Sequence, residues 1–263
     1  MNNSRCRAGA APAELATRQP KRLPYNPGET LFAALDVYHD AAPRSAAMNM
    51  AVDEALLELV TIPLIRFYRW QFPALSFGYF GRFANVASYQ FERDLVRRWT
   101  GGGIVFHGED LTYSLVIPAS DTAFAESAIS IYEKIHRALC DALSETGQPA
   151  VVAADADRGP GSATVATRTG IGDAGYSCFA NPVRADVMID GRKIAGAAQR
   201  RTRRGLLQQG SIQGIEFGNS LTEQFPQALS TNCRERKVDE EILNRASELA
   251  EQKYGTESWL RKR

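Results

Sequence analysis

Two side chains suited to acyl chemistry lie fifteen positions apart: Cys178 in the run YSCFANP, and Lys193 in the run DGRK. A thiolate accepts acyl groups well where a nearby cation lowers the pKa of the thiol. A lysine ammonium on the concave side of a sheet can polarise a carbonyl or steady a phosphate. Gly196 and Ala197 are small and leave room for a ligand beside Lys193. From the residues alone, two plainer interpretations stay open: Cys178 as a small buried hydrophobe, and Lys193 as a solvated strand residue.

A glycine triplet is the next candidate binding feature. Glycine lets the backbone take a positive φ and approach a ligand closely, and its bare N–H groups can face an anionic or carbonyl oxygen. The preceding arginine pair could bind carboxylate or phosphate, and the following histidine could orient a substrate or hydrogen-bond the loop. A simple hairpin turn with solvated arginines and a structural histidine is the alternative. In chain order this motif contains Arg97, Arg98, Gly101, Gly102, Gly103 and His107.

The composition is that of an ordinary soluble globular protein. The chain has 263 residues, 44% hydrophobic and 23% charged, with a net charge of +1. A net charge this small does not attract the protein electrostatically to nucleic acid or to a charged membrane surface. No apolar run approaches the roughly 20 residues that a membrane-spanning helix needs. We therefore expect neither nucleic-acid nor membrane partners.

The cysteines and histidines do not have the spacing of a metal site. The four cysteines lie far apart, and the three histidines show no ligand pattern, so we expect no metal. The first 25 or so residues carry four arginines and one lysine but no apolar core of a secretory signal. Scattered cysteines without such a signal favour a reducing cytoplasm.

Helices and hairpins alternate along the chain, which predicts an α+β fold around a central mixed, mainly antiparallel sheet flanked by helices. We expect residues 1–30 to form a disordered tail and residues 31–263 to form one catalytic domain. Residues 155–175 lack periodicity and predict a mobile loop beside the site. The expected elements are helices at 45–60, 126–146 and 238–254, strands at 64–70, 74–80 and 111–118, and a three-stranded meander at 185–213.

Four motifs in this order resemble the biotin/lipoate protein ligase family, and within it the catalytic domain of lipoate protein ligases and octanoyltransferases. They are NMAVDEALL, RFYRWQFPALSFG, RRWTGGGIVFHGEDLTYSLV and DVMIDGRKIAGAAQRRTRRGLLQQGSI. The resemblance covers roughly residues 36–213. The resemblance implies an octanoyl or lipoyl chain in a tunnel under the glycine turn, and Lys193 at the acyl carbonyl or the adenylate. It also implies lipoyl domains as acceptors, such as the glycine-cleavage H protein or 2-oxoacid dehydrogenase subunits.

The family contains two chemistries, and the sequence favours one of them. Octanoyltransferases need no cofactor and take octanoyl from acyl carrier protein onto a cysteine, and in one branch a Cys-Phe pair shortly precedes the DGRK lysine. Cys178 and Phe179 match that pair. The alternative is an ATP- and Mg-dependent lipoate–protein ligase that works through a lipoyl-adenylate held by Lys193. Gly103 and the run ANPVRAD are departures from the transferase pattern. A non-catalytic acyl- or lipoyl-domain-binding paralogue is the third interpretation.

Overall fold

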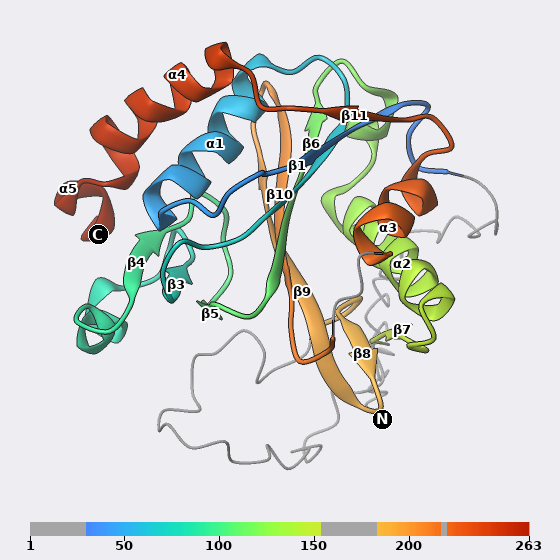
Figure 1. Cartoon of the computed structure of the whole chain (residues 1–263), viewed down its shortest axis with the longest axis horizontal. Helices are drawn as coiled ribbons and strands as arrows, with labels where there is room; N and C mark the ends of the chain where they lie inside the picture. The colour runs from blue at the N-terminus through green and yellow to red at the C-terminus, as the bar shows by residue number, and fades with distance from the viewer. Residues whose placement is uncertain (1–29, 154–182, 217–219, 263) are drawn as a thin grey trace, which may run out of the picture.

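An eight-stranded sheet crosses the molecule (Figure 1). The computed structural model describes residues 30–153, 183–216 and 220–262. In spatial order the strands are β11 (Cys233–Arg236), β1 (Leu35–His39), β2 (Leu64–Tyr68), β6 (Leu111–Pro118), β10 (Gly205–Ile212), β9 (Arg192–Arg201), β8 (Val187–Ile189) and β7 (Val151–Val152). The β11–β1 and β1–β2 pairs are parallel, and the other pairs in this order are antiparallel. The expected α+β fold with a mixed, mainly antiparallel sheet is confirmed.

A second, three-stranded sheet carries the glycine triplet. Its order is β4 (Asp94–Arg97), β3 (Ala74–Phe77) and β5 (Ile104–His107). Because β4 runs parallel and β5 antiparallel to β3, the segment 98–103 must cross the end of β3 to link the two outer strands. The glycines therefore form a crossover and not a hairpin turn between paired strands.

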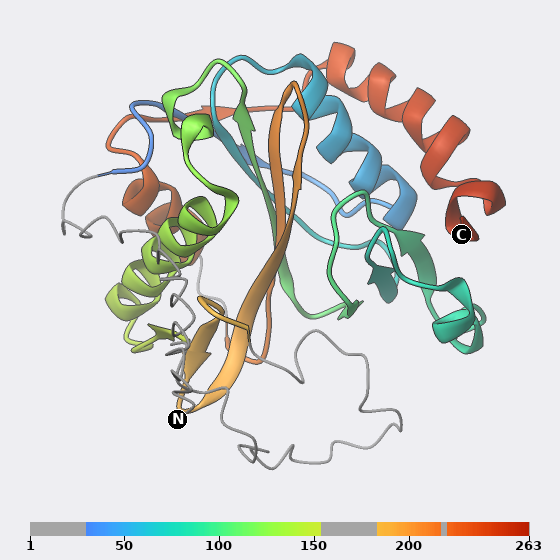
Figure 2. The ribbon, with the colours of Figure 1, turned by 180° about the vertical axis from the view of Figure 1, so that it is seen from behind.

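Helices cover both faces of the large sheet. Helices α1 (Ala46–Leu59) and α4 (Glu240–Leu249) lie on one face, and α2 (Ala128–Glu145) and α3 (Leu221–Leu229) lie on the other (Figures 1 and 2). Each face has its own apolar core. The last helix, α5 (Glu257–Leu260), follows α4 at the edge of the small sheet.

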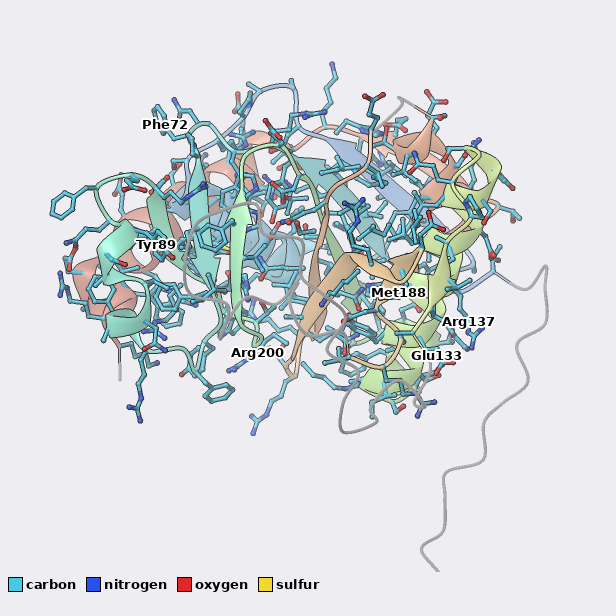
Figure 3. All side chains as sticks on the ribbon, turned by 90° about the horizontal axis from the view of Figure 1, so that it is seen from below. Phe72, Tyr89, Glu133, Arg137, Met188 and Arg200 are labelled. Atoms are coloured by element: carbon cyan, nitrogen blue, oxygen red, sulfur yellow. The ribbon has the colours of Figure 1, made fainter. Side chains whose placement is uncertain are left out.

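The two longest helices follow from their sequences. The Ser45 hydroxyl accepts the Met48 N–H at 3.3 Å and caps the start of α1. Helix α2 buries a stripe that includes Ile131 and Leu139, while Arg137 and Glu133 form an ion pair at 2.6 Å on its outer side (Figure 3). The helices expected at 45–60 and 126–146 and the meander at 185–213 are confirmed.

The C-terminal region differs from expectation. The single helix expected at 238–254 is α4 followed by a π-helical turn, Ala250–Tyr254. At that turn Lys253 and Tyr254 both donate to the Glu54 carboxylate of α1, at 2.6 and 2.5 Å. Strands β1 and β11 and helix α3 were not expected. The tail expected at 1–30, apart from its last residue, and the loop expected at 155–175 lie outside the described residues. No helix in the described ranges has the length and apolarity needed to cross a membrane.

Candidate active site

A cavity of about 380 Å³ lies between the large sheet, the small sheet and helix α1. Such a volume suits a small ligand, and the walls are mostly apolar with a few polar groups. Helix α1 contributes Met50, strand β2 contributes Tyr68, and Trp70 follows that strand. Strands β6, β9 and β10 form the large-sheet wall, and β3, β5 and the glycine crossover form the opposite wall.

Lys193 reaches this cavity and is held there by Asp186. The Lys193 ammonium lies 2.8 Å from Asp186 Oδ2, and both side chains are nearly inaccessible to solvent. The Tyr132 hydroxyl from α2 donates to Asp186 Oδ1 at 2.7 Å. Burial, with the Asp186 charge, raises the pKa of Tyr132, so this phenol stays protonated and donates. A fixed cation beside an apolar cavity can polarise a carbonyl or bind a developing oxyanion.

Gly196 and Ala197 contact the same cluster. A Cβ on Gly196 would lie 2.6 Å from Lys193 Cε and 2.7 Å from Nζ, so the lysine side chain passes over the bare glycine. The Ala197 N–H donates to the Tyr132 hydroxyl at 3.1 Å. Both residues line the cavity, as does Ala198 after them.

The glycine crossover closes the other wall. Gly102 and Gly103 line the cavity, whereas Gly101 does not. Gly102 has a φ of +85°, the left-handed conformation that favours glycine. The crossover lies directly on Gly78 at the end of β3, where a Cβ would come within 2.1 Å of the Gly102 carbonyl oxygen.

The two arginines before the glycines point to different places. Arg98 lines the cavity and donates from Nη2 to the Gly101 and Gly103 carbonyls, at 3.0 and 2.8 Å. Arg97 is buried away from the cavity and donates to five backbone carbonyls. Those carbonyls belong to Tyr79, Gly81, Trp259, Leu260 and Lys262.

The position of Arg97 corrects the expectation that both arginines contact substrate. Successive residues at the end of a strand face opposite sides, so only one of the pair can reach the cavity. Arg97 ties the C-terminal segment to the small sheet and is not carried into the proposed site.

His107 lines the cavity and stacks on Trp70, with ring centroids 4.0 Å apart. Its Nδ1 lies 2.7 Å from Asp110 Oδ2, and its Nε2 lies 2.7 Å from Ser76 Oγ. Burial lowers the pKa of His107 below 6.5, although Asp110 opposes that shift. The imidazole is therefore neutral near pH 7.

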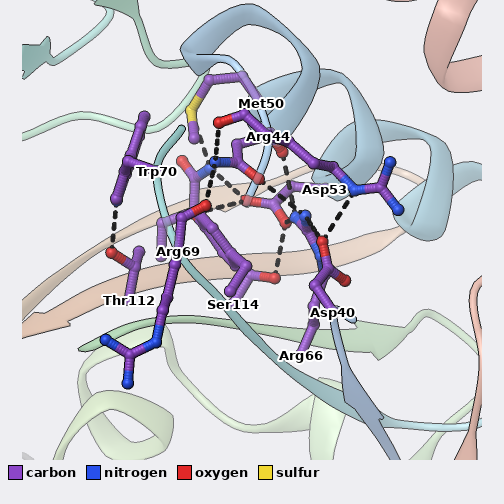
Figure 4. Close-up of polar contacts among 12 residues, drawn as sticks. Asp40, Arg44, Met50, Asp53, Arg66, Arg69, Trp70, Thr112 and Ser114 are labelled. Atoms are coloured by element: carbon purple, nitrogen blue, oxygen red, sulfur yellow. Dashed lines mark hydrogen bonds and ion pairs between the residues drawn. The ribbon is translucent and has the colours of Figure 1, made fainter. Parts of the chain in front are cut away.

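A buried polar network supports the cavity from the α1 side (Figure 4). Gln209 lines the cavity, donates to Asp53 Oδ2 at 2.7 Å and accepts the Thr100 hydroxyl at 2.8 Å. Arg66 is fully buried and lies 2.7 Å from Asp53 and 2.6 Å from Asp40. These ion pairs fix α1 on the sheet. Gln209 connects them to Thr100, the residue before the glycine triplet, through its hydrogen bonds to Asp53 and Thr100.

Several residues of the site were not found from the sequence. Asp186 lies in the same DVMIDGRK motif as Lys193, seven positions earlier, and that proximity was a usable signal. Ser76 and Gln209 come from other segments, and only the folded sheets bring them to the cavity. Tyr132 does not line the cavity and acts on it through Asp186.

Cys178 lies outside the described residues. Val183, five positions after it, is described, lines the cavity and donates its N–H to Asp186 at 2.6 Å. The part of the chain that the structure describes contains no group of three or more His, Cys, Asp or Glu side chains arranged to hold a metal.

Comparison with known proteins gives a family match over most of the chain. A model of the lipoyl protein ligase A/B catalytic domain matches residues 45–252. Octanoyltransferase LipM of Bacillus cereus is 34% identical over 187 residues, which cover 66% of this chain and 64% of that protein. Octanoyltransferase LipM of Symbiobacterium thermophilum is 35% identical over 192 residues, covering 70% and 65%. The matched region thus spans just under two thirds of these relatives.

Solved structures show the same fold. A lipoate-protein ligase A bound with ATP superposes with a TM-score of 0.66 at 22% identity, covering 87% of this chain and 98% of that one. A bipartite lipoate protein ligase from Thermoplasma acidophilum superposes with a TM-score of 0.62 at 21% identity, covering 87% and 95%. The cavity, the lysine motif and the glycine crossover all lie within the matched region, and this chain belongs to the lipoyl protein ligase A/B catalytic domain family.

Proposed function

We propose that this protein transfers an octanoyl group from acyl carrier protein to a lysine of a lipoyl domain. The acceptors would be the glycine-cleavage H protein or 2-oxoacid dehydrogenase subunits. One observation carries the proposal: the Lys193 ammonium is fixed by Asp186 against a mostly apolar cavity of about 380 Å³. The relatives named octanoyltransferase support this choice of acyl group.

The proposed reaction has two exchanges at one acyl carbonyl. In the first, the Cys178 thiolate attacks the octanoyl thioester, and the carrier thiol leaves with a proton. In the second, the acceptor lysine amine attacks the Cys178 thioester, an amide forms, and the Cys178 thiol is released. Lys193 would stabilise the negative oxygen of each tetrahedral intermediate, with N–H groups of the glycine crossover as further donors.

Cys178 enters this proposal through the sequence. The Cys-Phe pair matches the transferase branch, and Val183 shortly after it lines the cavity. Arg98, Gly102, Gly103, His107, Gly196 and Ala197 would contact the acyl substrate, because all of them line the same cavity. A transferase of this kind needs no cofactor and would work in the cytoplasm, where its thiol stays reduced.

An ATP-dependent lipoate–protein ligase is the second candidate. The similarity to the fold of a ligase bound with ATP favours it, as does glycine at position 103. In that reaction Lys193 and Arg98 would hold the acyl-adenylate, Mg would accompany the ATP, and Cys178 would be dispensable.

One experiment separates the candidates. The full chain is incubated with apo H protein and either octanoyl-acyl carrier protein, or octanoate with ATP and Mg, and the acceptor mass is followed. Octanoylation from the carrier protein that is lost in Cys178→Ala supports the transferase. Octanoylation only with ATP, retained in Cys178→Ala, supports the ligase instead. No modification from either donor contradicts both and leaves a non-catalytic acyl-binding protein.

A further inference from the structure

Four side chains form a continuous hydrogen-bonded chain along the small-sheet wall of the cavity. Asp110 Oδ2 lies 2.7 Å from His107 Nδ1, His107 Nε2 lies 2.7 Å from Ser76 Oγ, and Arg98 Nη1 lies 2.6 Å from the same Ser76 oxygen. All four residues are buried, each with a relative exposure of 6% or less. Ser76, His107 and Arg98 line the cavity.

The hydrogen bonds of this chain have one consistent direction. The ionised Asp110 can only accept, so the neutral His107 ring has its proton on Nδ1, and its bare Nε2 accepts from the Ser76 hydroxyl. Ser76 Oγ in turn accepts from Arg98 Nη1. The Asp110 carboxylate also accepts from the Ser211 and Thr112 hydroxyls and the Gly108 N–H, which fixes its orientation. Every member is therefore satisfied in one arrangement only.

Arg98, whose position these hydrogen bonds fix, also binds the glycine crossover. Its Nη2 donates to the carbonyls of Gly101 and Gly103. A trans peptide directs its N–H opposite to its carbonyl, so the Gly102 N–H points away from Arg98. Among the described residues no hydrogen-bond partner is found for this N–H, and Gly102 is exposed on the cavity wall.

We infer that Asp110, His107 and Ser76 are positioning residues: they fix Arg98, and Arg98 holds the glycine crossover so that the Gly102 N–H meets the acyl carbonyl oxygen. The role at the acyl carbonyl depends on the proposed acyl transfer, whereas the fixing of the crossover does not. Ser76, His107 and Asp110 share the hydrogen-bond pattern of the Ser-His-Asp triad of hydrolases, but not its chemistry. Ser76 has no exposed surface and accepts from an arginine, so it orders a neighbour and does not attack the substrate.

Protonation of His107 breaks the arrangement. An imidazolium has no acceptor nitrogen, so Ser76 loses the partner for its proton. The new charge faces the cations of Arg98 and Arg93, which oppose it, and the carboxylate of Asp110, which favours it. Acid therefore loosens Arg98, and kcat should fall on the acid side of the pH profile.

The test compares Ser76→Ala with Ser114→Ala as a matched control. Ser114 is equally buried and donates to the Asp53 carboxylate at 2.7 Å, but it does not line the cavity. Amide hydrogen exchange of segment 99–104 is measured in the free protein, and unfolding in urea confirms that each variant folds. Ser76→Ala should exchange at least ~10-fold faster in this segment, and Ser114→Ala should match the wild type. Equal exchange in wild type and Ser76→Ala overturns the inference, whether or not the protein transfers acyl groups.

Kinetics test the catalytic part. Ser76→Ala should lower kcat by roughly 10-fold or more, with KM for the octanoyl donor within about twofold of wild type. His107→Gln places an amide oxygen near the Nε2 position, so it should keep more activity than His107→Ala and lose the part of the acid limb that comes from His107, leaving only the part that protonation of the Cys178 thiolate causes. A wild-type acid limb in His107→Gln, or an unchanged kcat in Ser76→Ala, contradicts the positioning role. Absence of transfer by the wild type instead contradicts the proposed function.

Discussion

The Lys193 ammonium is the residue-scale feature on which the proposed chemistry depends. The Asp186 carboxylate lies beside it, the Tyr132 hydroxyl orients that carboxylate, and the lysine side chain passes over the bare backbone of Gly196. A cation held this rigidly stabilises developing negative charge without reorganising during the reaction. Substitutions at this cluster should therefore act on kcat more than on substrate affinity.

Lys193→Met should reduce octanoyl transfer by roughly 10²–10³-fold, because it removes the cation at the reacting oxygen. Lys253→Met is the matched control, since Lys253 also pairs with a carboxylate, Glu54 at 2.6 Å, but lies outside the cavity. Initial rates with octanoyl-acyl carrier protein and apo H protein measure both variants. A Lys193→Met rate above a tenth of wild type would remove this lysine from the mechanism.

Gly196→Ala should lower kcat, and it should also lower stability, because moving the Lys193 ammonium leaves the buried Asp186 carboxylate without its ion-pair partner. The new methyl would overlap the end of the Lys193 side chain, which is flexible and can move aside, so the strand itself need not shift. Gly108→Ala is the control, since a Cβ there meets no atom within 4 Å. Transfer rates and urea unfolding are compared for the two variants. Unchanged kcat in Gly196→Ala would show that the ammonium position is not critical.

Sequence reasoning named those cavity-lining residues that share a short motif. Lys193, Gly196 and Ala197 come from one strand, and neighbouring strand positions are readable from sequence order. The role of Tyr132 was missed because the helix sequence does not show that its hydroxyl meets polar groups. Those groups, Asp186 and the Ala197 N–H, reach it only when α2 packs beside β9. Arg97 was misplaced because adjacent strand residues look alike in sequence but face opposite sides.

At the scale of elements, the glycine crossover is positioned by the end of β3. The link between β4 and β5 has to pass over Gly78, and the absence of a side chain there permits backbone contact. On the outer side, Arg97 binds the carbonyls of the C-terminal segment, and Trp259 Nε1 donates back to the Arg97 carbonyl at 3.0 Å. The crossover is thus fixed from beneath by β3 and from outside by the C-terminal segment.

Gly78→Ala should displace the crossover and lower both stability and activity. The Cβ would lie 2.1 Å from the Gly102 oxygen and 2.6 Å from Gly101 carbonyl atoms, and backbone atoms cannot rotate away. Forced overpacking of this kind typically costs about 1–3 kcal/mol. Urea unfolding measures the stability, and transfer from the carrier protein measures the activity. A variant with wild-type stability and rate would show that the crossover does not rest on β3 as described.

The elements differ in how well sequence could predict them. The meander was predictable because Asp190 and Gly191 mark a tight turn, and both have a positive φ in the structure. The start of α1 was predictable because Ser45, a residue type that favours the N-cap position, directly precedes the helix. Strand β11 was not, because its sequence CRER is short and polar, and it pairs with β1 about 200 positions earlier. Long-range parallel pairing leaves no local pattern.

At the scale of the whole molecule, two buried histidines tie stability to pH. His136 donates from Nδ1 to the Ala185 carbonyl at 2.6 Å and lies 3.1 Å from the Tyr113 hydroxyl. Burial lowers the pKa of His136 to about 4, and burial also lowers that of His107. In both cases the folded protein favours the neutral ring, whereas the unfolded chain binds a proton near pH 6.5.

The free energy of unfolding should therefore fall as the pH drops from about 7.5 through 6.5 toward 4. His136 alone should account for about 2 kcal/mol of loss by pH 5, with a further contribution from His107. Urea unfolding at pH 7.5, 6 and 5 measures this slope. Equal stability at all three values would mean that neither ring is buried in its neutral form.

The overall architecture followed from the family motifs and the hydrophobic patterns. The division of the core between two faces of one sheet did not, because it depends on which helices, distant in sequence, cover the two faces of the same central strands. The cavity arises at the boundary between the large and small sheets, and no single segment contains it. Its existence could be inferred only from the resemblance.

The most direct test of the central claim is the mass of the intact protein after mixing with octanoyl-acyl carrier protein in the absence of acceptor. The account predicts one added octanoyl group, located on Cys178, absent in Cys178→Ala and transferred to apo H protein when that acceptor is added. A protein that octanoylates the acceptor without ever carrying the group, or that carries it on another residue, would contradict the account.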